Sequence, residues 1–459
     1  MQRWFISSNK IKVLHIGGNL RINGISTFIN NLLYGLDKTQ FEISVVNTAA
    51  DDGYYKQRFE SFGGKTYNIY TRGTSLIRAF GQAKKLKKII IKEGPFDVVH
   101  SHYFSNNGLY LKIAHDAKVP IRISHCHQSN LKIKFTKKIG VLISRKLIDK
   151  YATHRLGCSK EACIFLYGRR PYQIIYYGID YHKFKKKKID RHQAYRKLGL
   201  NADKKYIIQI GRFAKQKNPI FSLDVFKKIA DQNAFVDLII VGHGPLKEKI
   251  IRLINHLGLK ERVHILNPDI NVAEVYKIAE CLMLPSLWEG LPFVLIEAQA
   301  MGIRCFVSEN ITQEANIGLC SYLSLESNIW VKNIHNYVNQ NHKEQIIQHE
   351  RFDLKKMVIN ISKIYYNYLA EQYCDIAKEL SLGSVNYKTD KAKSIEFYKK
   401  AHELDNLRGT FGYALAFFEG NSVGRDRKKA QKLVSSIIVD VRKKAKKGDS
   451  KYQVVYGDM

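Results

Sequence analysis

Short apolar runs alternate with longer helix-like stretches along this chain, and the alternation occurs twice. Because parallel strands of one sheet are joined by helical crossovers, each series predicts a doubly wound parallel α/β fold. The stretch Ile25–Leu36, for example, has helical periodicity between two apolar runs. We expect strands at Ile11–Ile16, Phe41–Asn47, Phe96–His100 and Ile121–His125, and then at Tyr206–Ile210, Val236–Val241, Val263–Leu266, Cys281–Leu284 and Arg304–Val307.

The two series predict two Rossmann-like domains, over residues 1–180 and 191–370, joined by the charged linker Tyr181–Asp190. The remaining residues, 371–459, have an all-helical pattern. Similar helix starts near Asp390 and Lys429 indicate a period of about 40 residues, which is typical of solenoids built from helix pairs. An irregular helical tail is the alternative.

The chain is strongly basic, with 75 Lys and Arg against 41 Asp and Glu and a net charge of +34. Residues 1–190 hold 34 of the basic and 12 of the acidic residues, so the excess is concentrated there. Such an excess favours binding to a polyanion, although solvated lysines are the plainer explanation. The basic amphipathic stretch Leu131–Ala152 predicts contact with an anionic membrane surface, with a core helix as the alternative. No nucleic-acid reader motif occurs, so we expect no nucleic-acid partner.

The seven cysteines are scattered and form no CxxC pair, which favours a reducing cytosol over a disulfide framework. No signal-peptide pattern begins the chain. No run approaches the roughly 18 apolar residues of a membrane span. These features predict a cytoplasmic protein that meets the inner face of the cell membrane only peripherally.

The stretch Leu284–Met301 carries the strongest chemical signal. A strand ends at its start, a loop follows, and Pro292 is expected in the first turn of a helix. Free backbone N–H groups at such a helix start bind phosphate. Glu289 stands before this start and Glu297 about one turn into the helix. The N–H groups expected to face a phosphate belong to Gly290, Leu291 and Phe293.

A second signal follows the strand Tyr206–Ile210, where Arg212 and Lys217 lie in one loop. Two cations at the carboxyl end of a parallel strand suit a diphosphate leaving group, because they stabilise its growing negative charge. Ordinary surface cations are the alternative. Glycines that allow close backbone approach to a ligand follow strands in both halves, at Gly17, Gly18, Gly24, Gly242 and Gly244.

Histidines close two strands of the first half in the patterns HSH and HCH. Four imidazoles suggest zinc, but no carboxylate or cysteine cluster completes a ligand set, so we expect no metal. We expect one or two of these side chains to line the cleft and hydrogen-bond a sugar. The four are His100, His102, His125 and His127.

The region from about Lys10 to Ala370 resembles the family-four (group 1) retaining glycosyltransferases, in particular the bacterial exopolysaccharide and capsule enzymes. The resemblance implies the GT-B fold, in which two Rossmann-like domains face a cleft and the second binds the donor. A helix that returns to the first domain is expected at Phe352–Ala370. The stretches that carry the resemblance are NGISTFINNL, FDVVHSHYFSNNG, IRISHCHQSN, GCSKEA, YGID, IGRFAKQKN, VGHGPLKEKI and PSLWEGLPFVLIEAQAMGIRCFVSENIT.

The same resemblance implies roles for single residues. Arg212 and Lys217 match the pair that grips the donor diphosphate. Glu289 and Glu297 match the EX7E motif, in which the first contacts the donor sugar and the second the ribose. His127 matches a histidine near the reaction centre. Gly17, Gly18 and Gly24 match the loop under the donor phosphates, and Asn267 lies near the expected base pocket.

The implied reaction retains anomeric configuration and needs no metal or other cofactor. The implied donor is a UDP-sugar that carries a hexose or N-acetylhexosamine, and the acceptor is a lipid-linked glycan. In the proposed front-face mechanism, the departing phosphate helps to deprotonate the acceptor hydroxyl. Tyr177 departs from the family pattern, because it stands where NGID has asparagine.

The tail 371–459 resembles Sel-one-like repeats, which are relatives of the tetratricopeptide family. Such solenoids bind proteins, so the tail is expected to dock the enzyme to a partner. A catalytically degenerate GT-B scaffold that assembles a polysaccharide complex through this tail is the alternative function. The intact set of Arg212, Lys217, Glu289 and Glu297 argues against it.

Overall fold

The computed structural model describes residues 10–129, 135–182, 190–340, 347–383, 388–420 and 422–457. The chain forms two compact units, Met1–Ile359 and Asn360–Met459. Most of the predicted linker Tyr181–Asp190 and the start of the stretch Leu131–Ala152 lie outside the described residues.

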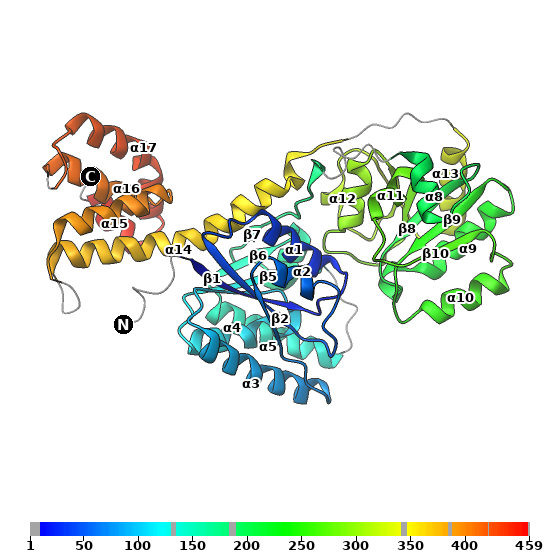
Figure 1. Ribbon diagram of the computed structural model, residues 1–459, viewed down its shortest axis with the longest axis horizontal. Coiled ribbons are helices and arrows are strands. Elements are labelled where there is room, and N and C mark those ends of the chain that lie inside the picture. Colours follow the sequence, from blue (N-terminus) through cyan, green and yellow to red (C-terminus); the bar gives the residue numbers. More distant parts are fainter. Residues whose placement is uncertain are drawn as a thin grey trace. The chain divides into compact units, whose positions relative to one another are not determined.

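Within the described residues, the first unit begins with a seven-stranded sheet in the order β3-β2-β1-β4-β5-β6-β7 (Figure 1). All neighbouring pairs are parallel. The four predicted strands are confirmed within one or two residues at each end. The strands are β1 (Ile11–Gly18), β2 (Phe41–Asn47), β3 (Lys65–Asn68), β4 (Val98–Ser101), β5 (Ile121–Cys126), β6 (His154–Gly157) and β7 (Gln173–Ile174).

Helices cover both faces of this sheet. Helix α4 packs against α3 on one side and α5 on the other, and all three lie on one face. Helix α1 begins after Asn23, whose side chain accepts hydrogen bonds from the N–H groups of Ile25 and Ser26. The helices are α1 (Gly24–Gly35), α2 (Lys56–Ser61), α3 (Ser75–Glu93), η2 (Phe104–Asn106), α4 (Asn107–Asp116), α5 (Phe135–Tyr151) and α6 (Lys160–Tyr167).

The second sheet of the same unit has six parallel strands within the described residues, in the order β10-β9-β8-β11-β12-β13. Its five predicted strands are confirmed. They are β8 (Lys205–Ile210), β9 (Val236–Val241), β10 (Val263–Leu266), β11 (Ala279–Leu284) and β12 (Arg304–Ser308), with β13 (Cys320–Leu323) at the edge. Its helices are α8 (Arg191–Leu198), η3 (Lys215–Lys217), α9 (Pro219–Ala230), α10 (Lys247–His256), α11 (Val272–Ile278), α12 (Phe293–Ala300), η4 (Gln313–Ala315) and α13 (Ser327–Val338).

Strand order reverses once in each sheet, between β1 and β4 and between β8 and β11. In open α/β sheets, ligands bind beyond the carboxyl ends of the strands at such a reversal. The predicted residues Gly17, Arg212 and Glu289 follow or end strands at these two positions. The fold therefore brings the strongest sequence signals to the edges where ligands bind.

After the second sheet, the chain returns to the first. Ile179 forms a parallel bridge with Asp353, and its N–H donates to the carbonyl of Phe352 in η5 (Glu350–Phe352) at 2.9 Å. Helix α14 (Leu354–Leu382) begins next. It starts two residues after the expected Phe352 and runs beyond Ala370, so residue 371 lies inside one continuous helix.

The second unit is helical throughout its described residues. Its helices after α14 are α15 (Lys391–Glu403), α16 (Leu407–Glu419), α17 (Arg427–Lys446) and α18 (Ser450–Gly457), and each packs against the next. Asp390 and Asp426 cap α15 and α17 in the same way, by accepting from the N–H three residues on. This likeness agrees with helix pairs, while the Sel-one-like assignment stays a prediction.

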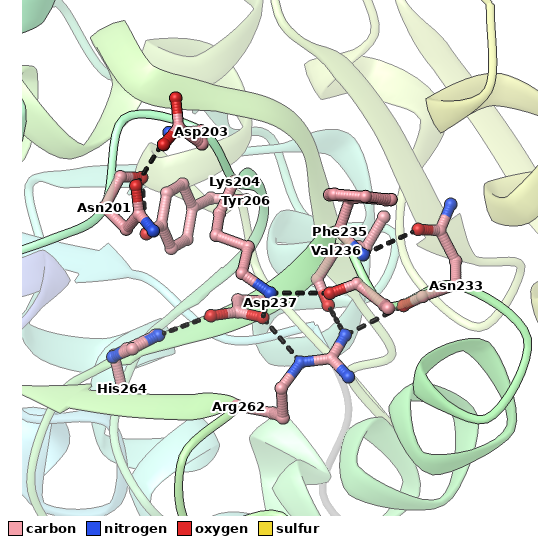
Figure 2. Close-up of polar contacts among 11 residues, drawn as sticks. Asn201, Asp203, Lys204, Tyr206, Asn233, Phe235, Val236, Asp237, Arg262 and His264 are labelled. Atoms are coloured by element: carbon pink, nitrogen blue, oxygen red, sulfur yellow. Dashed lines mark hydrogen bonds and ion pairs between the residues drawn. The ribbon is translucent and has the colours of Figure 1, made fainter.

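An ionic cluster around the buried carboxylate of Asp237 holds the amino ends of β9 and β10 together (Figure 2). The carboxylate of Asp237 accepts from Arg262 Nε at 2.7 Å, and its other oxygen lies 2.9 Å from His264 Nε2. Burial alone would raise the pKa of Asp237, but the hydrogen bonds from His264 and Arg262 outweigh it and lower that pKa. The cluster lies at the end of the sheet opposite the predicted ligand edge, so we assign it to stability.

No helix among the described residues has both the length and the apolar content that crossing a bilayer requires.

Candidate active site

Two charged residues from different loops of the second sheet, Lys217 and Glu289, form an ion pair. Lys217 ends the turn η3, and its Nζ lies 2.7 Å from Glu289 Oε1. Gln216 pins the loop that carries Glu289, because its carbonyl accepts from Leu287 N at 2.8 Å. Its side-chain amide donates to the carbonyl of Trp288 at 2.9 Å and to Glu289 Oε2 at 3.4 Å. The loops after β8 and β11 thus form one connected structure.

Arg212 follows β8 with an exposed side chain. Among the described residues it has no salt-bridge partner, so its guanidinium is available to an anion.

The two glycines of the VGHGP stretch position the backbone around Arg212. A β-carbon on Gly242 would lie 2.0 Å from the carbonyl oxygen of Gly211, and one on Gly244 would lie 2.5 Å from that of Phe213. That these glycines allow the close approach of a ligand stays a prediction. In the structure they allow the approach of the Arg212 loop, which Phe213 N fixes by donating to the carbonyl of His243 at 2.8 Å.

Helix α12 begins at Phe293. Pro292 was predicted in the first turn, but it is the residue immediately before that turn. The backbone N–H groups of Gly290, Leu291 and Phe293 donate to no protein atom in the described part of the chain. Such unpaired groups at a helix start suit an anion, and the binding of phosphate there stays a prediction. The side chains of Leu291 and Phe293 are buried.

Gly290 brings this loop against the end of β5. A β-carbon there would lie 2.1 Å from the carbonyl oxygen of His127, closer than any real side chain approaches. The hydroxyl of Ser129 donates to the carbonyl of Glu289 in the same contact. The glycine therefore permits contact between two protein backbones, in addition to any approach of phosphate.

Glu297 lies on α12 and is half-buried. The hydroxyl of Tyr276, on α11, donates to Glu297 Oε2 at 3.0 Å. Burial and then the nearby Glu297 carboxylate raise the pKa of Tyr276 well above its ordinary value, so Tyr276 stays a donor. Asn267, the residue expected near the base, is exposed just after β10 at the sheet edge.

The predicted glycine loop of the first sheet lies where β1 passes into α1. Gly17 and Gly18 are the last residues of β1, and Gly24 is the first of α1. The position of a β-carbon on Gly24 is 3.9 Å from the ring of Phe293. The loop therefore lies beside the start of α12, where the free N–H groups are.

Five histidines, not four, gather on one face of the first sheet. His15 of β1 joins the predicted four, and all five are buried. Residues two apart on a strand point to the same face, which explains why the HSH and HCH patterns converge. Phe28 of α1 packs against three of these rings.

Hydrogen bonds join three of these rings in a row. His15 Nδ1 lies 3.0 Å from His102 Nε2, and His102 Nδ1 lies 2.8 Å from His127 Nε2. The remaining nitrogen of His127 lies 2.8 Å from the hydroxyl of Tyr177. Both nitrogens of His127 are thus occupied, and a sugar hydroxyl could bond its ring only by replacing one of these partners.

Burial keeps the histidine cluster neutral. It lowers the pKa of His15 and of His127 to about 3. Two sets of three rings place ligand atoms within 4.8 Å of one another: His15, His100 and His102, and then His102, His125 and His127. Neither set includes a carboxylate or thiolate to offset a buried cation, and hydrogen bonds already engage these rings. The absence of a metal stays a prediction.

Comparison with known proteins matches both halves of the chain. The description "Glycosyltransferase Family 4" fits residues 22–182, and "Glycosyl transferases group 1" fits residues 190–316. The chain is 30% identical over 342 residues to the putative glycosyltransferase EpsF of Bacillus subtilis, which covers 72% of this chain and 88% of that protein. The chain belongs to the group 1, family-four glycosyltransferases.

Other relatives of this glycosyltransferase have more specific names. A UDP-Gal:alpha-D-GlcNAc-diphosphoundecaprenol alpha-1,3-galactosyltransferase of Escherichia coli is 29% identical over 65% of this chain and 80% of its own length. The capsular polysaccharide biosynthesis glycosyltransferase CapH of Staphylococcus aureus is 25% identical over 77% of this chain and 98% of its own. The solved structure of Anabaena Alr3699/HepE with UDP and glucose has a TM-score of 0.65 at 16% identity, over 77% of this chain and 98% of that one. It confirms the GT-B fold.

Sequence reasoning missed four residues that shape the site of this glycosyltransferase. Gln216 and Tyr276 hold the two glutamates of the EX7E motif. His15 and Tyr177 complete the histidine row. His15 had a usable signal, since it lies near the end of a predicted strand beside those that carry the other histidines, and Tyr177 was marked only as a departure from the family pattern.

Proposed function

We propose that this glycosyltransferase moves a hexose or N-acetylhexosamine from a UDP-sugar to a lipid-linked precursor of exopolysaccharide or capsule, with retention of anomeric configuration. The observation that carries the proposal is the grouping of Lys217, exposed Arg212 and the free N–H groups at the start of α12. Cations and unpaired N–H groups together suit a diphosphate.

The donor would lie across the carboxyl ends of β8 and β11. Arg212 and Lys217 would contact the diphosphate, and the carboxylate of Glu297, which Tyr276 already orients, would accept from the ribose hydroxyls. Glu289, held by Lys217 and Gln216, would contact the sugar. UDP as the nucleotide is supported by the name of the E. coli relative and by the ligand of the HepE structure.

In the proposed reaction, the bond between the anomeric carbon and the diphosphate oxygen breaks while the acceptor oxygen attacks from the same face. The acceptor proton passes to the departing phosphate oxygen, so UDP leaves with that proton and no protein base is required. Arg212 and Lys217 stabilise the negative charge that grows on the diphosphate. The reaction as proposed uses no metal and no cofactor.

A lipid-linked acceptor is supported by the diphosphoundecaprenol in the name of the E. coli relative and by the basic character of residues 1–190. We place the enzyme at the cytoplasmic face of the membrane, where Leu131–Ala152 would contact anionic lipid. In the described part of that stretch, Leu142 and Ile143 are exposed, which agrees with the proposal. A protein partner of the helical tail is also proposed, and deletion of residues 388–459 tests it by co-purification.

A nucleotide-release assay tests the function. Wild-type protein is incubated without acceptor and with UDP-, GDP- and ADP-sugars in turn, with and without EDTA. We expect slow release of UDP from one UDP-sugar, unchanged by EDTA and absent in Glu297→Ala and Arg212→Ala. Release of no nucleotide, together with no thermal stabilisation by any of them, would favour the scaffold alternative.

A further inference from the structure

Helix α3 presents large apolar side chains to solvent. Phe80 is 74% exposed, Ile91 66% and Ile77 58%. The opposite side of the helix is buried through Leu86, Ile90 and Gln82, and Gln82 accepts from the hydroxyl of Tyr110 on α4 at 2.9 Å. The exposed residues therefore form a second apolar side, which packing against α4 does not explain.

Lysines lie on that same side of α3. At 100° per residue, Ile77, Phe80, Lys84, Lys88 and Ile91 fall within one narrow stripe opposite Leu86. Lys87 lies at its border. Within the described residues, none of these three lysines has a carboxylate partner. The stripe consequently combines unpaired positive charge with exposed apolar groups.

We propose that this stripe of α3, defined as Ile77, Phe80, Lys84, Lys87, Lys88 and Ile91, docks the enzyme on an anionic lipid bilayer. Apolar side chains would enter the headgroup boundary, and the lysine ammonium groups would meet lipid phosphates. The proposal deepens the proposed function, since it rests on an acceptor that is anchored in a membrane.

Charge and spacing favour lipid over a protein partner. Lysine is depleted from the buried centre of protein interfaces, because three ammonium groups there would lose their water. At a bilayer, the same lysines extend their stems along the apolar zone and keep their charges in the headgroup layer. The stripe places Lys84 and Lys88 between the apolar side chains of Phe80 and Ile91, and this arrangement suits that environment.

Helix α5 belongs to the same layer, since α4 packs against both α3 and α5. Its exposed pair Leu142 and Ile143 is followed by the exposed lysines Lys146 and Lys150. Among the side chains that the structure describes on these two helices, those of the α3 stripe form the larger exposed apolar set, and the stripe lies outside the stretch Leu131–Ala152 that the sequence singled out. We therefore assign the main lipid contact to α3.

Vesicle flotation of the full-length protein tests the proposal. The vesicles contain phosphatidylcholine with phosphatidylglycerol, or phosphatidylcholine alone. We expect wild type to bind only the anionic vesicles, and more weakly as salt rises. Ile77→Ser with Phe80→Ser should weaken binding about tenfold or more. Lys84→Gln, Lys87→Gln and Lys88→Gln together should weaken it about 100-fold, at roughly fivefold per lysine.

Matched control variants distinguish binding through the α3 stripe from nonspecific binding through other exposed apolar or positively charged side chains. Phe235→Ser removes another exposed aromatic, 69% exposed before β9, and Lys247→Gln with Lys249→Gln removes charge from α10. Both should bind like wild type. Anionic-vesicle binding that the α3 variants leave unchanged would overturn the proposal, and the stripe would then fit a protein partner.

The failures of the two proposals are distinguishable, because donor hydrolysis requires neither vesicle nor acceptor. The α3 variants should release UDP at the wild-type rate. If wild type floats with anionic vesicles through α3 but releases no nucleotide, the proposed function fails and the docking surface stands.

Discussion

The ammonium group of Lys217 lies 2.7 Å from the carboxylate of Glu289, and both side chains are largely shielded from water. The two residues belong to different loops, after β8 and after β11, and are 72 positions apart. A donor diphosphate would compete with Glu289 for Lys217. The pair thus links the group proposed to grip phosphate with the group proposed to contact sugar.

Replacing Lys217 with methionine keeps the side-chain stem and removes the charge. We expect kcat for nucleotide release to fall by about 100- to 1,000-fold, because one preorganised charge on the leaving group is lost. Some stability should also be lost, since Glu289 stays buried without its cation. Release kinetics and thermal unfolding measure the two effects. Lys215→Met, an exposed lysine on the same turn, is the control, and equal kcat in both variants would refute the role.

Gly290→Ala tests the contact between the Glu289 loop and β5. The new methyl group would lie 2.1 Å from the carbonyl oxygen of His127, so the loop must move. We expect about a 100-fold loss of activity, as a displacement of roughly 1 Å costs in a site of this kind. Gly140→Ala is the control, since a β-carbon there meets nothing within 4 Å. Near-normal activity of Gly290→Ala would show that the contact does not position the site.

The fold followed from the sequence wherever strands were central and apolar. The largely buried strands IKVLHI and VDLIIV left mainly apolar runs that marked their positions, although Lys12, His15 and Asp237 interrupt these runs. The four strands that prediction missed are short, and two of them, KTYN and HRLG, carry polar or basic residues. The residue pattern of such a strand cannot reveal it, because the strand forms through pairing with a neighbouring strand and not through its own apolar periodicity.

Candidate site residues could be proposed from the sequence where the motif itself is local, as in Arg212 with Lys217 and Glu289 with Glu297. Residues that act through distant partners could not be predicted. Tyr177 reaches His127 from 50 positions away, and it does so from the position where the family pattern has asparagine. The role of Gly290 could not be predicted either. Only the fold shows that the backbone of His127 lies where a side chain at position 290 would have to be.

The neutral histidine cluster predicts a stability that depends on pH. The pKa of His15 and of His127 is about 3 in the folded state, against 6.5 in an unfolded chain. Between these values the unfolded chain binds more protons, so stability is complete above pH 6.5 and falls as the pH falls toward 3. Each such histidine contributes a slope of about 1.4 kcal/mol per pH unit. Urea unfolding between pH 8 and pH 4 measures it.

A histidine variant checks the source of that slope. His125→Asn removes one buried ring, and burial lowers the pKa of that ring well below its ordinary value. The slope should therefore fall by about 1.4 kcal/mol per pH unit in this variant. His192→Asn changes an exposed histidine and should leave the slope unaltered. Equal slopes in His125→Asn and wild type would mean that the cluster is not the origin of acid sensitivity.

Asp237→Asn tests whether the cluster at the amino ends of β9 and β10 serves stability alone. Removing the charge leaves Arg262 without its buried partner, which should cost about 3 kcal/mol of unfolding free energy near neutral pH. The pKa of Asp237 lies below its ordinary value, so its contribution is present above about pH 4 and is lost as the pH falls through the folded pKa. Wild type and variant should therefore converge in stability at low pH, as urea titrations would show.

Folded Asp237→Asn should still release UDP at the wild-type rate, because Arg212 and Glu289 follow the carboxyl ends of their strands. Asp224→Asn, at an exposed ion pair on α9, is the matched control, and a loss of kcat specific to Asp237→Asn would place the cluster in the reaction.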